Sequence, residues 1–199
     1  MDLSIIIINK NYKKYLKHCI LSCCKQNTKY SYEIIIVDDG SSDGSVGLIN
    51  MFKGSNIKRF LIKNQGIEKA SNLGIKKSKG KYIMRVDSDD YLKSNCVEKL
   101  MNFILKKDCA FVYANYYLIK ENKIIKNITL PKFDKEEIFQ RGDFLASGTI
   151  YLKKIMKKLG YFNVTKKNSG LENYELILKL LLSGFKGYHK NEFLFYYRK

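Results

Sequence analysis

Ile-Ile-Ile-Val-Asp-Asp-Gly-Ser-Ser-Asp at residues 34–43 and Tyr-Ile-Met-Arg-Val-Asp-Ser-Asp-Asp at residues 82–90 are two apolar runs that each end in carboxylates. Short continuous runs rich in β-branched residues are typical of buried parallel strands. Because ligands bind at the carboxyl ends of such strands, we expect both acidic clusters to face one site. Carboxylates without nearby His or Cys favour Mg²⁺ or Mn²⁺. The sequence therefore predicts a site that binds a nucleotide through a metal ion and the diphosphate of that nucleotide.

Strand-like and helix-like segments alternate through the first half of the chain. We expect strands at residues 3–8, 33–37, 57–62 and 81–86, and helices around residues 15–23, 42–52 and 66–76. Strands that alternate with helices in this way predict an α/β fold, with a doubly wound, Rossmann-like and mostly parallel sheet flanked by helices.

The second half is less regular, but no repeat or linker interrupts it. We expect helices at 95–106 and 153–159, strands at 110–120, 123–130 and 193–198, a site wall at 144–151, and a late helix opened by 170–175. We therefore predict a single domain over residues 1–199. Residues 1–90 form its nucleotide-binding half and residues 91–199 its acceptor-binding half.

The chain is strongly basic. It carries 37 Lys and Arg against 19 Asp and Glu, a net charge of +18 over 199 residues. The lysines are scattered over nearly every segment, so we favour a solvated surface first, attraction to an anionic membrane or substrate second, and nucleic acid last. No apolar run reaches the roughly 20 residues that span a bilayer, and no basic signal-peptide start precedes the first strand. We expect a cytoplasmic protein, with peripheral contact at the inner face of the membrane as one use of its charge.

Several short motifs occur in a fixed order along the chain. They lie at residues 4–7, 11, 15–16, 37–43, 64–67, 72–75, 80–83, 87–90, 160–162 and 172–176. With these landmarks the chain resembles the family 2 glycosyltransferases of the GT-A fold along nearly its whole length. Each motif alone is weak, since a bare Asp-x-Asp occurs by chance in many proteins. Their common order carries the resemblance.

The resemblance implies how a nucleotide-sugar donor binds. Asp39 would accept a hydrogen bond from the base, most naturally from N3–H of uracil, with Asp38 nearby. In the Asp-Ser-Asp motif, Asp89 would ligate a divalent cation, and Asp87 would approach the ribose or a metal-bound water. Asp90 would support either role. The other residues that the resemblance places in the donor site are Ile8, Asn11, Asn64, Gly66, Asn72, Arg85 and Ser88. Arg85 would pair either with the diphosphate or with a neighbouring carboxylate.

A purely structural interpretation of the two clusters is the alternative. Asp38 and Asp39 would then belong to a turn, and Asp89 and Asp90 would cap a helix. We favour the metal site, because carboxylates concentrated without a cation would repel one another. The cation, Mg²⁺ or Mn²⁺, would act as a Lewis acid on the diphosphate.

The resemblance also implies a catalytic base. Family members invert the anomeric centre by direct displacement, so a carboxylate must take the proton of the acceptor hydroxyl. The family's Glu-Asp pair at the start of a late helix reads Glu172-Asn173 here, and an amide cannot act as a base. We expect Glu172 to substitute, with Glu175 as the second candidate. A place on a surface helix is the alternative for both.

Together these features predict an inverting, metal-dependent glycosyltransferase. It would move a sugar from a nucleotide sugar, expected to be a UDP-sugar, to a glycan or lipid-linked acceptor in the synthesis of a cell-surface polysaccharide. Two alternatives stay open. One is a non-catalytic nucleotide-sugar-binding relative that has lost its base, and the other is a basic nucleic-acid-binding protein.

Overall fold

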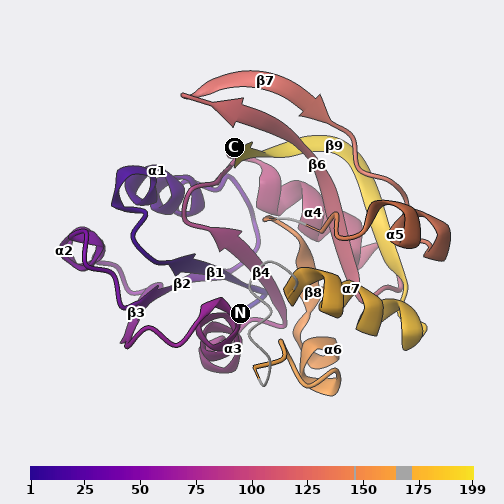
Figure 1. The fold of residues 1–199 in the computed structure, drawn as a ribbon, viewed down its shortest axis with the longest axis horizontal. Helices are drawn as coiled ribbons and strands as arrows, with labels where there is room; N and C mark the ends of the chain where they lie inside the picture. Colours follow the sequence, from indigo (N-terminus) through magenta and orange to yellow (C-terminus); the bar gives the residue numbers. More distant parts are fainter. Residues whose placement is uncertain (146, 165–171) are drawn as a thin grey trace.

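The structure is a computed structural model that describes residues 1–145, 147–164 and 172–199. Its first half forms the parallel part of a sheet (Figure 1). Four strands lie side by side in the order β3-β2-β1-β4, and each neighbouring pair runs parallel. They are β1 (Leu3–Asn9), β2 (Tyr32–Asp39), β3 (Ile57–Ile62) and β4 (Tyr82–Asp87).

Helices cover both faces of this part of the sheet. Because side chains alternate along a strand, the four isoleucines at residues 5–8 of β1 divide between two hydrophobic cores. Burying each such side chain contributes about 1.5–3 kcal/mol. One core includes α1 (Lys13–Cys24), α2 (Ser45–Met51) and α4 (Cys96–Leu105), and the other includes α3 (Ile67–Lys77) and α7 (Glu172–Leu182). A strand that is apolar on both faces thus has a helical layer on each side.

The second half of the chain continues the same sheet. From β4 the order runs β8-β6-β9-β5, and β7 pairs with β6 at the upper edge in Figure 1. The remaining elements are β5 (Tyr91–Leu92), β6 (Phe111–Lys120), β7 (Lys123–Ile128), α5 (Lys135–Arg141), β8 (Ile150–Leu152), α6 (Lys153–Lys158) and β9 (Gly187–Arg198). The pairs β4–β8, β6–β8, β6–β7 and β5–β9 are antiparallel, whereas β6–β9 is parallel. The predicted α/β class, with a mostly parallel sheet flanked by helices in a single domain, is confirmed.

Five elements differ most from the sequence-based expectation, and two of them, β5 and β8, are short strands that the sequence does not predict. Strand β9 starts at Gly187 rather than at residue 193, because its polar first residues pair with the start of β6. Helix α5 is not predicted, although Asp134 caps it by accepting a hydrogen bond from Glu137 N at 2.9 Å. Helix α2 begins three residues later than expected, because the Asp43 carboxylate accepts from Ser45 N at 2.9 Å. Residues 146, 170 and 171, in the expected site wall and helix opening, lie outside the described residues.

Candidate active site

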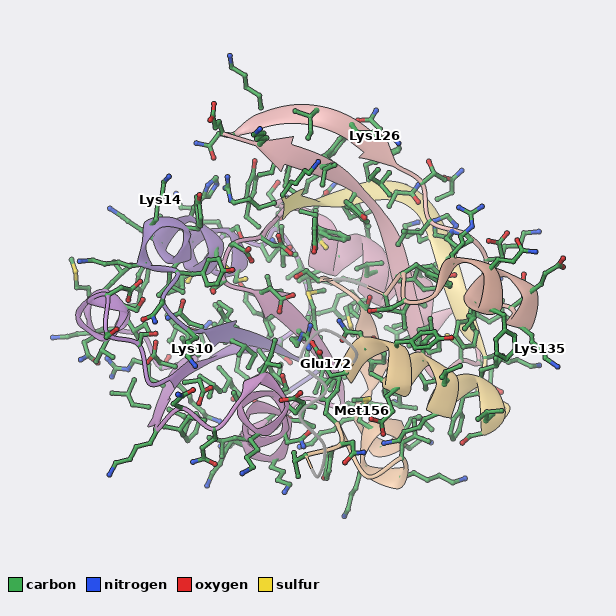
Figure 2. The ribbon with its side chains drawn as sticks, viewed as in Figure 1. Lys10, Lys14, Lys126, Lys135, Met156 and Glu172 are labelled. Atoms are coloured by element: carbon green, nitrogen blue, oxygen red, sulfur yellow. The ribbon has the colours of Figure 1, made fainter. Side chains whose placement is uncertain are left out.

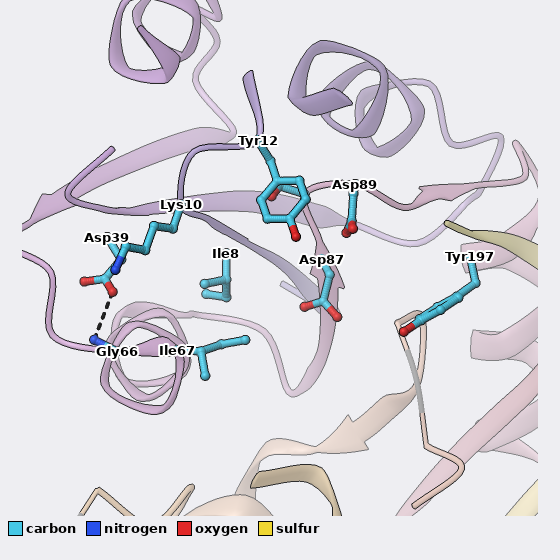
Figure 3. Close-up of a pocket in the computed structure, with 10 residues that line it drawn as sticks. Ile8, Lys10, Tyr12, Asp39, Gly66, Ile67, Asp87, Asp89 and Tyr197 are labelled. Carbon is cyan, nitrogen blue, oxygen red and sulfur yellow. Dashed lines mark hydrogen bonds between the residues drawn. The ribbon is translucent and has the colours of Figure 1, made fainter. Parts of the chain in front are cut away.

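A pocket of about 400 Å³ lies at the carboxyl ends of β1, β2 and β4, beside the start of α3 (Figure 3). Its volume is typical of small-ligand sites. The residues that line it are Ile8, Lys10, Tyr12, Asp39, Gly66, Ile67, Asp87, Ser88, Asp89 and Tyr197. The sequence predicts all of these except Lys10, Tyr12, Ile67 and Tyr197 as donor-site residues.

The register of the sheet brings the two acidic clusters together. Asn9 of β1 is opposite Asp38 of β2, and Ile8 is opposite Asp87 of β4. Because neighbouring parallel strands end at the same edge of the sheet, the carboxylates that follow β2 and β4 flank the end of β1. The expectation that both clusters face one site is met by Asp39, Asp87 and Asp89.

Asp38 and Asp39 have different surroundings, because successive strand residues point to opposite faces. Asp38 is buried, and its carboxylate accepts hydrogen bonds from Asn9 Nδ2 at 2.7 Å and from Ser41 N and Oγ at 2.9 and 2.7 Å. Asp39 lines the pocket and accepts from the backbone N–H groups of residues 65 and 66 at 2.6 and 2.9 Å. Each of its oxygens keeps a second lone pair, so Asp39 can accept a further hydrogen bond from a ligand.

Three predicted asparagines lie outside the pocket wall. The Asn11 amide oxygen accepts from the backbone of the loop after β2 at 2.8 Å. Asn64 accepts a hydrogen bond from Lys10 Nζ, which lines the pocket. The Asn72 side chain donates to Phe162 O at 2.8 Å and accepts from Phe162 N at 3.0 Å. These contacts hold the segments around the pocket in place.

The Asp-Ser-Asp motif puts two carboxylates into the pocket. Burial, followed by repulsion from Asp87, raises the pKa of Asp89. The charge of Asp89 in turn raises the pKa of Tyr12, whose ring lies between Lys10 and Asp89 in Figure 3. Asp90 is not part of the wall: it is buried, and burial raises the pKa of its carboxyl group well above the usual value. Asp90 therefore stabilises the acidic loop from the protein interior and not from the pocket wall.

The carboxylates of the pocket fit a metal ion that arrives with a nucleotide. Within residues 1–145, 147–164 and 172–199, no group of three or more His, Cys, Asp or Glu side chains is placed to hold a metal. Mg²⁺ usually needs only one or two carboxylates, because phosphates and water complete its octahedral shell. Asp87 and Asp89 both line the pocket and supply that partial set.

Arg198, the last residue of β9, links this strand to the acidic loop after β4. Its backbone N donates to Asp90 Oδ1 at 2.9 Å, and its Nε donates to Asp89 O at 3.1 Å. Its guanidinium lies 4.1 Å from the centre of the Tyr15 ring, a cation–π contact. The preceding residue, Tyr197, lines the pocket. The end of β9 therefore forms one wall of the site.

Arg85 joins the acidic loop to the start of α7. Its Nε lies 3.3 Å from Asp87 Oδ1, and its Nη1 lies 3.6 Å from Glu172 Oε1. Burial opposes its charge, but the Asp87 and Glu172 carboxylates keep the pKa of Arg85 above its usual value. Glu172 is only 7% exposed and lies near the centre of the molecule (Figure 2). Arg85 and Glu172 therefore adjoin the pocket without lining it.

The other two candidates for the base have partners of their own. The Asn173 side chain lies near Asp143, which follows α5, and lowers the pKa of that carboxyl group. Glu175 Oε1 lies 2.9 Å from Lys179 Nζ, one turn further along α7. The structure thus places four polar residues at the start of α7, and one of them, Asp143, comes from the loop that follows α5.

Several residues of the site are not predicted from the sequence. Tyr12 follows Asn11 in the loop after β1, so its position next to a predicted residue was a usable signal. Tyr197, Arg198 and Asp143 have no local signal, because the pairing of β9 with β5 and the packing of α5 near α7 bring them to the site.

Comparison with known proteins identifies related sequences. A family model described as Glycosyl transferase family 2 matches residues 4–160. An uncharacterized glycosyltransferase of Haemophilus influenzae is 33% identical over 167 residues, which cover 81% of this chain and 66% of that protein. The Escherichia coli protein WfaP, named a UDP-Glc:alpha-D-GlcNAc-diphosphoundecaprenol beta-1,3-glucosyltransferase, is 32% identical over 198 residues, 98% of this chain and 76% of its own.

Solved structures of similar fold include S. aureus TarS in complex with UDP. The TM-score is 0.83 at 20% sequence identity, and the match covers 100% of this chain. The chain spans 61% of that TarS chain and 66% of the Haemophilus influenzae relative, so both are longer. At this identity the likeness to TarS establishes the fold.

Proposed function

Because the chain belongs to glycosyl transferase family 2, we propose that it is an inverting glycosyltransferase that uses a nucleotide sugar. We propose a UDP-sugar as donor and a glycan or lipid-linked acceptor, in the synthesis of a cell-surface polysaccharide. The pocket in which Asp39 meets Asp87 and Asp89 carries this proposal. The name of WfaP, with a UDP-sugar and a lipid diphosphate, and the UDP and UDP-GlcNAc complexes of TarS support the two substrate classes.

We assign different parts of the donor to different residues of the pocket. Asp39 would accept a hydrogen bond from the uracil N3–H, since its carboxylate keeps free lone pairs. Asp87 and Asp89 would face the diphosphate, whose negative charge needs a cation beside two carboxylates. A Mg²⁺ or Mn²⁺ ion bound there would neutralise charge on the leaving diphosphate. Lys10, which also lines the pocket, adds a positive charge.

The start of α7 supplies the proposed catalytic group, with Glu172, Asn173 and Glu175. The Glu172 carboxylate faces Arg85, which also pairs with Asp87. A fixed positive charge at that place favours negative charge that grows on the leaving group. We therefore propose that Glu172 contributes to transfer by holding Arg85 beside the diphosphate.

Donor binding should depend on a metal ion through Asp89. Asp89→Asn nearly keeps the shape of the side chain but removes one charged ligand, so we expect UDP affinity in Mn²⁺ to fall by at least about 10-fold, a loss of about 1.4 kcal/mol. Isothermal titration calorimetry of UDP, with and without Mn²⁺, measures this. Asp108→Asn, on an exposed loop before β6, is the matched control and should bind like the wild type. Equal UDP affinity with and without Mn²⁺ in wild type and Asp89→Asn would contradict the metal assignment.

We also propose a cytoplasmic protein with peripheral contact at an anionic membrane. In the described parts of the chain, no helix combines the length and the apolar character that a membrane crossing needs. Strand β7 lies at the edge of the molecule in Figure 1 and exposes Ile124 and Ile125 between Lys123 and Lys126. Apolar side chains next to lysines are the combination that binds an anionic lipid surface.

The membrane contact should be weak and reversible by salt. Each basic side chain near an anionic surface contributes about 1 kcal/mol, and salt screens this attraction. We expect co-sedimentation with phosphatidylserine-containing vesicles at low ionic strength, and a several-fold loss in a Lys123→Glu/Lys126→Glu variant. Lys157→Glu/Lys158→Glu, on α6, makes the same charge change and should have a smaller effect. No co-sedimentation of the wild type would end this proposal.

The amide of Asn173, which cannot act as a base, favours a second candidate function. In this alternative the protein binds nucleotide sugars but does not transfer the sugar. This candidate keeps UDP binding through Asp39 and Asp89 and lacks transfer. Release of UDP from a UDP-sugar by the wild-type protein distinguishes the two. A nucleic-acid-binding protein, by contrast, would bind independently of both aspartates and lose affinity steeply with salt.

A further inference from the structure

We infer that Asp143 is the catalytic base of this protein and takes the proton of the acceptor hydroxyl, beside the position where Asn173 cannot. This inference rests on the proposed transfer reaction. It rests on the contact between two segments that are separated in the sequence, the end of α5 and the start of α7.

The contact between Asn173 and Asp143 brings a carboxylate to the start of α7. Helix α5 packs near α7, and Asp143 follows α5 by two residues. The Asn173 side chain lies close enough to Asp143 to lower the pKa of its carboxyl group, and the backbone N–H of Leu145 donates to Asp143 Oδ1 at 2.9 Å. The bond from Leu145 therefore orients Asp143, whose carboxylate lies beside the Asn173 amide.

Accessibility separates Asp143 from Glu172. Glu172 is buried, and the Arg85 guanidinium lies 3.6 Å from its carboxylate. A base must come within hydrogen-bond reach of the hydroxyl or reach it through one water. Asp143 keeps exposed surface although neighbouring groups surround part of its carboxyl group, so an acceptor can approach it. Glu175 is directed to Lys179 along α7 instead.

The charges around Asp143 suit a base that works near neutral pH. Burial of the carboxyl group among its neighbours raises the pKa of Asp143 to about 6, against the hydrogen bonds from Leu145 N and Asn173 and the charge of Arg85. Repulsion by Glu172 adds to the rise. The phenol groups of Tyr151 on β8 and Tyr116 on β6 also face this charge. Because Asp143 keeps exposed surface, water also stabilises its charge, and we expect its pKa to rise no further than about 6.

The proposed step is one displacement. The acceptor O–H proton passes to a carboxylate oxygen of Asp143, and the acceptor oxygen forms a bond to the anomeric carbon. The bond from that carbon to the diphosphate oxygen breaks, and its electron pair leaves with the nucleoside diphosphate. Asp143 then releases the proton to water, which restores the carboxylate.

Moving the carboxylate between the two positions tests the inference. The probes are UDP-glucose and UDP-GlcNAc with Mn²⁺, and the readout is UDP release, which needs no known acceptor because water can take the sugar. Asp143→Asn, which can still accept from Leu145 N, should lower the rate by about 100-fold or more and leave UDP affinity within about twofold of wild type. The double variant Asp143→Asn/Asn173→Asp should recover at least about a tenth of the wild-type rate. Asp108→Asn is the matched control.

The pH profile gives a readout that a structural role would not move. An Asp143 base must be ionised, so the wild-type rate should fall as pH drops below about 6, and the double variant should shift that limb. A full rate in Asp143→Asn overturns the inference. So does a rise of 10-fold or more in Asn173→Asp alone, because the wild type would then lack a base. Bound UDP without turnover in the wild type overturns the base and leaves the donor site standing, whereas no UDP binding overturns the proposed function itself.

Discussion

Glu172→Gln should lower kcat by about 100-fold, with little change in UDP affinity. Glu172 is buried, and its carboxylate lies 3.6 Å from Arg85 Nη1. A neutral amide leaves the buried guanidinium with one counter-charge fewer, so Arg85 is expected to move toward Asp87. A misplacement of about 1 Å at the reacting groups can cost about 10²-fold. Initial rates with a saturating UDP-sugar measure kcat, and calorimetry measures UDP affinity.

The controls for this variant separate a positioning residue from a base. If Glu172 holds Arg85, Glu172→Gln lowers the whole pH profile and keeps an acidic limb, which belongs to Asp143 and moves to lower pH because the repulsion by Glu172 is lost. A limb that disappears in Glu172→Gln would make Glu172 the base, as the sequence suggests. Glu175→Gln should have a smaller effect, because that carboxylate pairs with Lys179 on the same helix. Full activity in Glu172→Gln would remove the residue from the catalytic group.

Gly187→Ala should destabilise the fold by about 3 kcal/mol, the upper part of the range for an overpacked core. A Cβ atom at residue 187 would lie 2.1 Å from Phe111 Cζ. The Phe111 ring is fully buried and packs against the rings of Tyr113, Phe133 and Tyr151, so it has little room to move. The free energy of unfolding in urea, measured by circular dichroism, checks this prediction.

The chain offers a matched control for this substitution. Gly47 lies in α2, is exposed, and would bring its Cβ within 4 Å of nothing. Because alanine favours a helix over glycine by about 1 kcal/mol, Gly47→Ala should leave the protein as stable or slightly more stable. Equal stability of Gly187→Ala and wild type would show that β6 and β9 can separate to admit a methyl group.

The parallel half of the fold and its acidic edge could be predicted from the sequence, because local patterns determine both. A run such as 34–37 is apolar at every position, which requires burial on both faces, and the carboxylates follow directly. The distinction between Asp38 and Asp39 could not be predicted, since it depends on which neighbour meets Asn9 and Ser41 and which meets the loop at residues 65–66.

The second half could be predicted less well, because its site residues depend on distant pairing. Strand β9 starts with polar residues that resemble a loop, and only its register with β6 makes them a strand. Tyr197 reaches the pocket through that strand. Asp143 is an ordinary loop residue in the sequence, and only the packing of α5 near α7 places it beside Asn173.

The hydrogen bonds of Arg198 also have a consequence for the synthesis of the protein. They join Arg198 to Asp90, which lies 108 positions earlier in the chain, and to Asp89, which lies 109 positions earlier. At about 5–20 residues per second, a ribosome needs on the order of 5–20 seconds to pass from one partner to the other. During that interval the nascent chain contains the residues of the four parallel strands and of the acidic loop, but not yet the residues of β9 that fix this loop. A chain stalled before residue 197 would therefore display its carboxylates without a finished donor pocket.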